Sequence, residues 1–362
     1  WNEPDNLKSN TPEFAADFAI RTAEVIKREI PDARIAAFAL GKADVTFVEP
    51  FVRELERRGE ARLFETIAYH QYRHNPDNRA AYALLDDCQA LIDRHAPNLK
   101  LMEGEGGTQS EWCGSGALSK YPWTELKQAK YDLRRALGDL GHGHDTSVFH
   151  LCDLEYRTSG FHDGLVRYGL VKTTGQAEGY RVLKVKKAYY AIQNAASVFN
   201  DDFESLATRS TSRVEGLVRG VAYDWRHRAT GLGAVVFWES ASEPSDSCQT
   251  KKVALRVRGR SFSQPVWGDL ITGDVYEIDS ADVREEGEWT IYRVPAYDAP
   301  TFVTDRSLLT LDQSWFVRAT DGWGLLLRDG VHVRRVRFYG PYPKATEATK
   351  NEYARYKGAV CQ

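Results

Sequence analysis

The chain has 362 residues, 42% of them hydrophobic and 27% charged, a composition that excludes disorder and suits about two globular domains. Its net charge of −3 is spread along the chain without a basic block, which argues against nucleic acid as a partner. No apolar run reaches the ~18 residues that a membrane-spanning helix needs.

The cysteine and aromatic contents narrow the class of protein further. Five cysteines are an odd number without a C-x-x-C spacing, so neither a disulfide framework nor a zinc site is indicated. Aromatic residues make up 12% of the chain, which fits a large core or a surface that stacks sugar rings. The localisation stays open.

The first 200 residues alternate short apolar runs with amphipathic segments, the pattern of parallel βα units. Thr11 and Pro12 begin the first helix, in which Phe14, Phe18 and Val25 recur at helical spacing. Including the strand that ends at WNEPDN, five strands alternate with five helices. The later strands are expected at 34–40, 63–72, 99–107 and 147–154, and the later helices at 47–59, 78–95, 124–141 and 180–199.

The chain changes character near residue 203. Short segments rich in Val, Ile, Tyr and Trp follow one another, separated by Gly, Asp and Pro turns, which is typical of an antiparallel β-sandwich. The predicted fold class is therefore α/β plus all-β. The predicted domains are residues 1–200, then a sandwich at 201–343, then a tail at 344–362 that includes a short helix.

Polar side chains gather at the predicted strand ends. Glu3 ends the first strand, His70 and Tyr72 end the strand at 63–72, and Glu105 ends the strand at 99–107. His70 and Tyr72 are two residues apart, so they share one face of their strand. In a closed βα barrel the active site lies at the carboxyl ends of the strands, so all of these side chains belong to one rim.

WNEP, H-x-Y and a strand ending in E-x-G together resemble the clan A retaining glycoside hydrolases. The resemblance implies an eight-stranded barrel in which WNEP ends strand 4 and the later strands are 5 to 8. It implies that Glu3 is the general acid/base, that Asn2 bonds the sugar 2-hydroxyl and that Glu105 is the nucleophile. His70 and Tyr72 match a pair near the nucleophile in several member families. The implied function is double-displacement cleavage of a β-linked glycoside or polysaccharide, without a cofactor or metal.

Retaining hydrolysis explains why two carboxyl groups are needed. One carboxyl group is protonated and releases the leaving oxygen, while the other, ~5–5.5 Å away, is ionised and forms the glycosyl-enzyme. A histidine or tyrosine donor beside the nucleophile stabilises its anionic form. Strand ends that face each other across a barrel can place two carboxyl groups at such a distance.

The nucleophile has a second candidate on the same strand. Glu103 shares a face with Glu105 because the two are two residues apart. The E-x-G pattern and the position nearest the rim favour Glu105, whereas Glu103 lies one layer deeper and needs a partner for its charge. The glycines that follow lack a Gly-Lys-Ser/Thr ending, which argues against a phosphate-binding loop.

Three further features carry weaker hypotheses. Trp112 and Trp123 follow the predicted strand at 99–107, where each is a stacking platform for a sugar or simply packs the loop. Asp153, near the end of the strand at 147–154, is a candidate for a sugar hydroxyl contact. The turn at 141–145 contains two histidines and an aspartate, but a turn after a helix is favoured over a metal site.

Barrel strands 1 to 3 have no counterpart in the chain, which also departs from the family in lacking a tryptophan on the last barrel strand. Five parallel strands do not close a barrel. We therefore expect a C-terminal fragment, or a subunit whose missing N-terminal barrel segment comes from another chain. The alternative function is a glycan-binding or partner-completed protein without turnover. A metal-dependent hydrolase or aldolase would need His or Lys at several strand ends, and only His70 is so placed.

Overall fold

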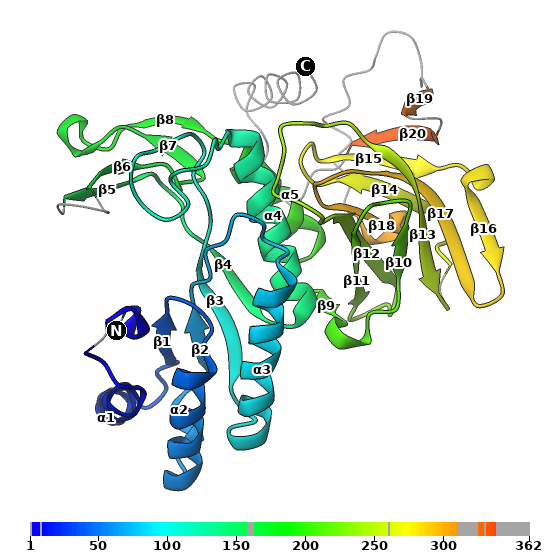
Figure 1. Cartoon of the computed structure of the whole chain (residues 1–362). Coiled ribbons are helices and arrows are strands. Elements are labelled where there is room, and N and C mark those ends of the chain that lie inside the picture. The colour runs from blue at the N-terminus through cyan, green and yellow to red at the C-terminus, as the bar shows by residue number, and fades with distance from the viewer. Residues whose placement is uncertain are drawn as a thin grey trace. The chain divides into compact units, whose positions relative to one another are not determined.

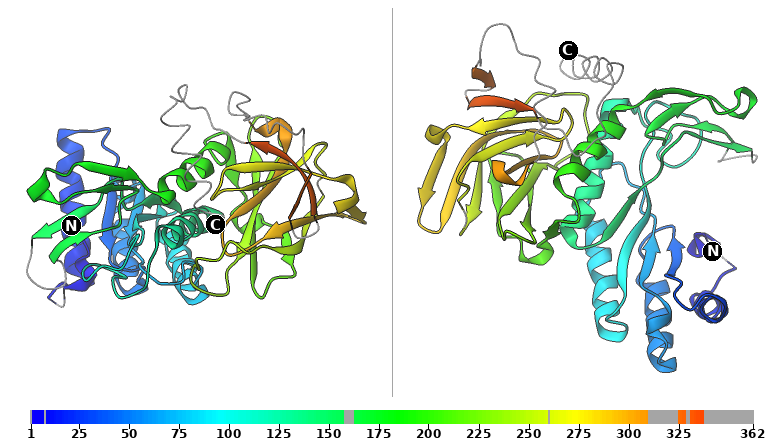
Figure 2. Two further views of the ribbon diagram at one scale, coloured as in Figure 1. Left: turned by 90° about the horizontal axis from the view of Figure 1, so that it is seen from above. Right: turned by 180° about the vertical axis from the view of Figure 1, so that it is seen from behind.

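A computed structural model describes residues 2–7, 9–157, 163–259 and 261–309, together with the backbone of 325–328 and 331–337. The chain divides into two compact units, whose elements are labelled in Figure 1 and seen from two other sides in Figure 2. The first unit holds residues 1–107 and 144–150, and the second holds 108–143 and 151–362. The domain boundaries expected at residues 200 and 343 stay predictions. The tail at 344–362 lies outside the described residues.

The first unit is a parallel four-stranded sheet with three helices. Its strands lie in the order β1-β2-β3-β4, and every neighbouring pair is parallel. The parallel pairing predicted for the four later strands is thus confirmed, with shorter bounds. The elements are η1 (Pro4–Asn6), α1 (Pro12–Glu29), β1 (Ala36–Leu40), α2 (Val45–Arg58), η2 (Ala61–Leu63), β2 (Thr66–Tyr69), α3 (Arg79–His95), β3 (Lys100–Gly106) and β4 (Asp145–Val148).

Local sequence fixes where these helices begin and end. The side chains of Thr11, Asp44 and Asn78 each accept a hydrogen bond from a backbone N–H in the first turn of α1, α2 and α3. Such a cap stabilises a helix by about 1 kcal/mol because it satisfies a donor that has no partner inside the helix. Gly59 ends α2 with φ of 70°, a conformation that favours glycine.

The helices and the sheet share one apolar core. Phe51 of α2 meets Phe38 of β1 and Phe64 edge to face, with ring centroids 4.6 Å and 5.1 Å apart. Strands β1, β2 and β3 also bury apolar side chains in this core. This core holds the carboxyl ends of β1, β2 and β3 in place.

The second unit contains two large antiparallel sheets. The order of one is β19-β20-β15-β14-β18-β12-β11-β9, and that of the other is β10-β13-β17-β16. Phe237 and Trp267 of the first sheet and Leu255 and Tyr292 of the second belong to one buried cluster, so the sheets enclose a common core. The strands are β9 (Phe203–Ser205), β10 (Arg213–Glu215), β11 (Gly220–His227), β12 (Gly233–Glu239), β13 (Lys251–Arg258), β14 (Pro265–Asp269), β15 (Asp274–Ile278), β16 (Val283–Glu286), β17 (Trp289–Ala296), β18 (Thr301–Asp305), β19 (Leu325–Arg328) and β20 (Val331–Arg337).

Two hairpins correct the sequence prediction between residues 147 and 199. The predicted strand at 147–154 ends at Val148, and the next residues pair elsewhere: Val171 N donates to Leu151 O, and Asp153 N donates to Val171 O. The predicted helix at 180–199 begins only at Lys187, because the residues before it form a strand. The elements here are β5 (Leu154–Arg157), β6 (Asp163–Val166), β7 (Val171–Thr173), η3 (Gln176–Glu178), β8 (Val182–Val185) and α5 (Lys187–Val198).

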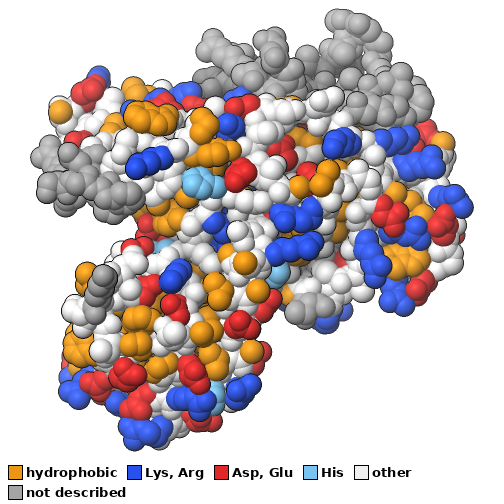
Figure 3. Space-filling model, in the orientation of Figure 1, with side chains coloured by type: hydrophobic (Ala, Val, Ile, Leu, Met, Phe, Trp, Pro, Cys, Tyr) orange, Lys and Arg blue, Asp and Glu red, His pale blue; other side chains and the backbone are white. Residues whose placement is uncertain are grey.

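In the ranges that the structure describes, no helix is both long and apolar enough to cross a membrane. On the face drawn in Figure 3, acidic and basic side chains are interspersed among apolar ones.

Helix α4 (Glu125–His142) buries charged side chains within the second unit. Lys130 Nζ lies 2.5 Å from Asp298 Oδ1 and 2.6 Å from Ser247 O, so its charge is compensated. Asp132 is also buried, and within the described part of the chain neither of its carboxylate oxygens has a hydrogen-bond partner. Burial raises the pKa of Asp132 well above its ordinary range, although the charge of Lys186 acts in the opposite direction.

We expect Asp132→Asn to be more stable than the wild type at neutral pH. Because the pKa of Asp132 is raised in the folded state, its contribution to stability is fully present at pH values below the pKa of Asp132 in the unfolded chain. This contribution is lost as the pH rises toward the folded-state pKa. The asparagine does not titrate, so its advantage should shrink as the pH falls to about 4. Urea unfolding of both proteins between pH 4 and 8 measures this difference. A difference that stays constant with pH would contradict a protonated Asp132.

Candidate active site

The segment that carries Glu3 is attached to the carboxyl end of β1. Glu3 N donates to Ala39 O at 2.8 Å, and Asp5 Oδ1 accepts from Gly41 N at 2.8 Å. Asn10 Nδ2 also donates to Pro4 O at 2.9 Å, which closes the segment on itself. Glu3 is therefore held beside the sheet by both backbone and side-chain bonds.

The backbone on both sides of this attachment is strained. Glu3 has φ of 48°, and Phe38 and Ala39 have φ of 69° and 72°, in the left-handed region that favours glycine. The register between β1 and β2 shifts between Phe38 and Leu40. Each such residue costs about 1–3 kcal/mol, and such strain clusters at functional sites. The strain lies where β1 meets the Glu3 segment.

His70 brings the two predicted catalytic carboxylates together. Its Nδ1 atom lies 3.2 Å from Glu3 Oε1 and 3.2 Å from Glu105 Oε2. His70 N donates to Leu40 O at 2.6 Å, which fixes the residue directly after β2. Glu3 and Glu105, the two carboxylates that the sequence predicts to be catalytic, thus both face one nitrogen of the His70 ring. The three residues come from the segment before α1, the residue directly after β2, and strand β3.

The two carboxylates reach solvent while the imidazole does not. The side chain of His70 is 4% exposed, against 30% for Glu3 and 21% for Glu105. Tyr72 OH donates to Glu105 Oε1 at 2.8 Å, so both oxygens of Glu105 face a side chain from the segment after β2. A ligand from solvent can meet both carboxylates but not the ring that joins them.

The structure separates the two glutamates of β3. Glu103 is fully buried, and its Oε1 lies 3.4 Å from Gln71 N. A Cβ atom at Gly106 would come within 3.0 Å of Glu103 Cγ, so glycine leaves room for the buried side chain. Glu105, by contrast, is accessible. The geometry favours Glu105 as the reactive carboxylate, as the sequence does.

Asn6 is a neighbour of Glu3 that the sequence analysis missed. Its Nδ2 donates to Glu3 Oε2 at 2.6 Å, because η1 turns the chain after Pro4 and brings residue 6 back to residue 3. The proline after Glu3 was the available signal. Gly41 packs against Asn6, since a Cβ there would lie 2.8 Å from Asn6 Nδ2. Asn2, which was predicted, is exposed.

The remaining predicted residues lie in the second unit. Trp112 is 69% exposed, whereas Trp123 is buried and donates its Nε1–H to Leu118 O at 2.7 Å, which favours packing for Trp123. The Asp153 side chain is fully buried and is bonded to Arg167 and Lys186. Asp153 is therefore not on the strand that was predicted for it, and its carboxylate is not accessible to solvent. A sugar contact of Asp153 stays a prediction.

The histidine-containing turn at 141–145 is a helix end. Gly143 follows α4 with φ of 86° and donates its backbone N–H to α4 carbonyls. His144 is buried and its ring lies edge to face with Tyr69, 6.4 Å between centroids. Within the described residues no group of three His, Cys, Asp or Glu side chains is arranged to hold a metal ion.

Comparison with known proteins gives distant structural neighbours. No protein-family model and no curated protein matches the chain. A glycoside hydrolase family 17 beta-1,3-glucanosyltransferase from Rhizomucor miehei is 15% identical, with a TM-score of 0.33 over 47% of this chain and 57% of that chain. AbfB, a family 51 alpha-L-arabinofuranosidase from Bifidobacterium longum, is 13% identical, with a TM-score of 0.39 over 84% of this chain and 66% of that one.

A structure of a BuGH86 variant in complex with neoagarooctaose is 9% identical, with a TM-score of 0.43 over 84% of this chain and 50% of that one. These three structures are of glycan-active enzymes. The chain spans between 50% and 66% of the length of these three structures.

We expect Gly41→Ala to lower activity more than stability. The added methyl displaces the Asn6 amide, which releases its hydrogen bond to Glu3, but the displaced group is exposed and costs little on folding. Turnover should fall several-fold while the urea midpoint changes little. Gly114→Ala is the matched control, because nothing lies within 4 Å of a Cβ at that position. Equal effects of the two variants would contradict a positioning role of Asn6.

Proposed function

We propose that this chain carries the catalytic carboxyl pair of a retaining glycoside hydrolase. Glu105 is the nucleophile and Glu3 the general acid/base. The observation that carries the proposal is the approach of both carboxylates to His70 Nδ1, at 3.2 Å each, with both partly open to solvent. The substrate class is a β-linked glycoside or polysaccharide.

In the first step Glu105 attacks the anomeric carbon and the bond from that carbon to the leaving oxygen breaks. Glu3 transfers its proton to the leaving oxygen, which departs as an alcohol. In the second step Glu3, now ionised, takes a proton from water, and the water oxygen attacks the anomeric carbon. Glu105 leaves as a carboxylate and Glu3 is again protonated, so the cycle closes.

The spacing of the carboxylates favours retention over inversion. Glu3 Oε1 and Glu105 Oε2 each lie 3.2 Å from the same atom, so these oxygens are separated by no more than twice that distance. Retaining enzymes need carboxyl groups ~5–5.5 Å apart, whereas inverting enzymes need ~6.5–9.5 Å for the water between them. The close approach of both carboxylates to one atom supports the retaining assignment.

His70 and Tyr72 support this exchange of charge. A single Nδ1–H of His70 donates to Glu105 when Glu105 is ionised, and to Glu3 once Glu105 has become an ester and Glu3 has lost its proton. Tyr72 OH donates to Glu105 Oε1 and stabilises the departing carboxylate. Asn2, which is exposed beside Glu3, is proposed to bond the sugar 2-hydroxyl.

Removal of each carboxylate tests the assigned roles. On a panel of aryl glycosides we expect Glu105→Ala to lose at least ~10³-fold in kcat, and azide to restore activity with formation of the azide of inverted configuration. Glu3→Ala should lose most activity on poor leaving groups and little on activated ones, and azide should give the retained product.

Glu13→Gln, on the exposed first turn of α1, is the control and should keep full activity. An unchanged rate in Glu105→Ala rules the mechanism out.

A second candidate function is that of a subunit whose sheet is completed by another polypeptide. Strand β1 lies at one edge of the parallel sheet of the first unit. Helix α1 buries Ile20 on one face, yet Phe14 and Phe18 are 55% and 47% exposed on another, with their rings stacked 6.3 Å apart. An adjacent βα unit would cover both the strand edge and this apolar stripe.

The native mass separates the two candidates. If the purified protein is heavier than one chain and Phe18→Ser releases a second polypeptide together with the activity, the completed assembly is the enzyme. If the single chain turns over substrate and Phe18→Ser does not change kcat, completion by a partner is excluded. Thr22→Ser, exposed on the same helix, is the control.

A further inference from the structure

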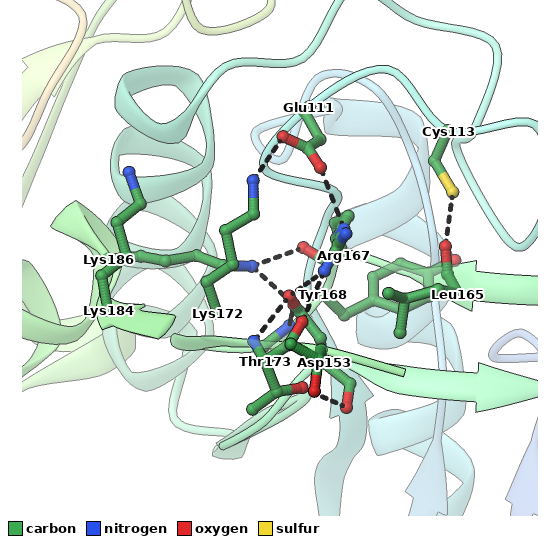
Figure 4. A network of polar contacts seen from close by, with 12 residues as sticks. Glu111, Cys113, Asp153, Leu165, Arg167, Tyr168, Lys172, Thr173, Lys184 and Lys186 are labelled. Atoms are coloured by element: carbon green, nitrogen blue, oxygen red, sulfur yellow. Dashed lines mark hydrogen bonds and ion pairs between the residues drawn. The ribbon is translucent and has the colours of Figure 1, made fainter. Parts of the chain in front are cut away.

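The segment between β3 and α4 is fixed to the hairpins of the second unit on both sides of Glu111. Ser110 N donates to Arg167 O at 3.0 Å, and Arg167 N donates to Gln109 Oε1 at 2.6 Å. On the other side of Glu111, Cys113 Sγ donates to Leu165 O at 3.2 Å, as Figure 4 shows. The backbone at Glu111 is therefore held without any contribution from the Glu111 carboxylate.

The Glu111 carboxylate lies between two cations. Arg167 Nε is 2.9 Å from Glu111 Oε1, and Lys172 Nζ is 2.9 Å from Glu111 Oε2 (Figure 4). Each oxygen therefore has a cation of its own. Such an arrangement recognises a planar carboxylate by geometry as well as by charge.

Arg167 is held in place independently of Glu111. Arg167 Nη1 donates to Asp153 Oδ2 at 2.9 Å and to Thr173 O at 2.8 Å. Asp153 is fully buried and is bonded on its other oxygen by Lys186 Nζ at 2.6 Å. Asp153 and the Thr173 carbonyl thus orient the Arg167 guanidinium, and its Nε atom points at the Glu111 carboxylate.

Glu111 is the most exposed member of this group. Its side chain is 43% exposed, compared with 19% for Arg167 and 22% for Lys172. Burial opposes its ionisation, but the Lys172 hydrogen bond and the charges of Lys172, Arg167 and Lys186 outweigh burial, so the pKa of Glu111 is lowered. Ion pairs of such an exposed carboxylate contribute little to folding. Another carboxylate can therefore replace it at small cost.

We propose that Arg167 and Lys172 form a binding site for the carboxylate of an acidic sugar residue, which Glu111 occupies when no ligand is bound. Trp112 follows Glu111 in the chain and is 69% exposed, which suits an aromatic ring that stacks on the sugar. The choice of a sugar as the carrier of the carboxylate rests on the proposed glycosidase function. The site itself belongs to the second unit and contains neither Glu3 nor Glu105.

Opposite effects of two substitutions test this proposal. Calorimetric titration of the full chain with a galacturonate trisaccharide is compared with titration with the neutral galactose trisaccharide. We expect the wild type to bind the acidic sugar alone, Glu111→Gln to bind it about threefold to tenfold tighter, and Lys172→Met to bind it about tenfold weaker. If Glu111 and Lys172 have only a structural role, both substitutions should weaken binding of the acidic sugar or leave it unchanged.

Glu178→Gln is the matched control, since Glu178 is an exposed glutamate paired with Arg181 on the neighbouring turn, and it should leave the affinity unchanged. Thermal unfolding checks that each variant is folded. Performing the titrations in a Glu105→Ala background prevents cleavage of the ligand if Glu105 is the nucleophile, and it leaves the residues of the Glu111 site unchanged in either case. Equal binding of both trisaccharides, or no binding to either the wild type or Glu111→Gln, overturns the proposal.

Discussion

One imidazole nitrogen, Nδ1 of His70, faces two carboxylates that lie 102 residues apart in the chain. Everything near the candidate site depends on the position of this ring. The backbone hydrogen bond from His70 N to Leu40 O fixes it at the end of β2. The apolar core of the first unit includes residues of α1, α2 and α3 together with residues of these strands.

The position of Glu3 depends on hydrogen bonds to the end of β1 and within its own segment. Three hydrogen bonds hold it: Glu3 N donates to Ala39 O, Gly41 N donates to Asp5 Oδ1, and Asn6 Nδ2 donates to Glu3 Oε2. Glu3 and Ala39 both adopt the left-handed backbone conformation, and this strain accompanies the placement of the Glu3 carboxylate beside the sheet.

The sequence predicts the parallel sheet because each apolar run is bounded by helix caps and glycines. It also predicts that Glu3, His70, Tyr72 and Glu105 lie together, since the ends of adjacent parallel strands share an edge. It does not predict Asn6, whose place depends on a single turn after Pro4. The hairpins at 151–185 were also missed, because short Val- and Leu-rich runs suit helix or strand alike.

The division of the chain into units has a consequence for dissection and synthesis. The chain leaves the first unit at Gly107, returns to it for residues 144–150, and leaves it again. No single cut separates the units: a break after residue 107 removes β4 from the parallel sheet, and a break after residue 150 removes α4 from the antiparallel unit. During synthesis the parallel sheet gains its last strand only after α4 has emerged, and α4 must then wait for the sheets made later in the chain.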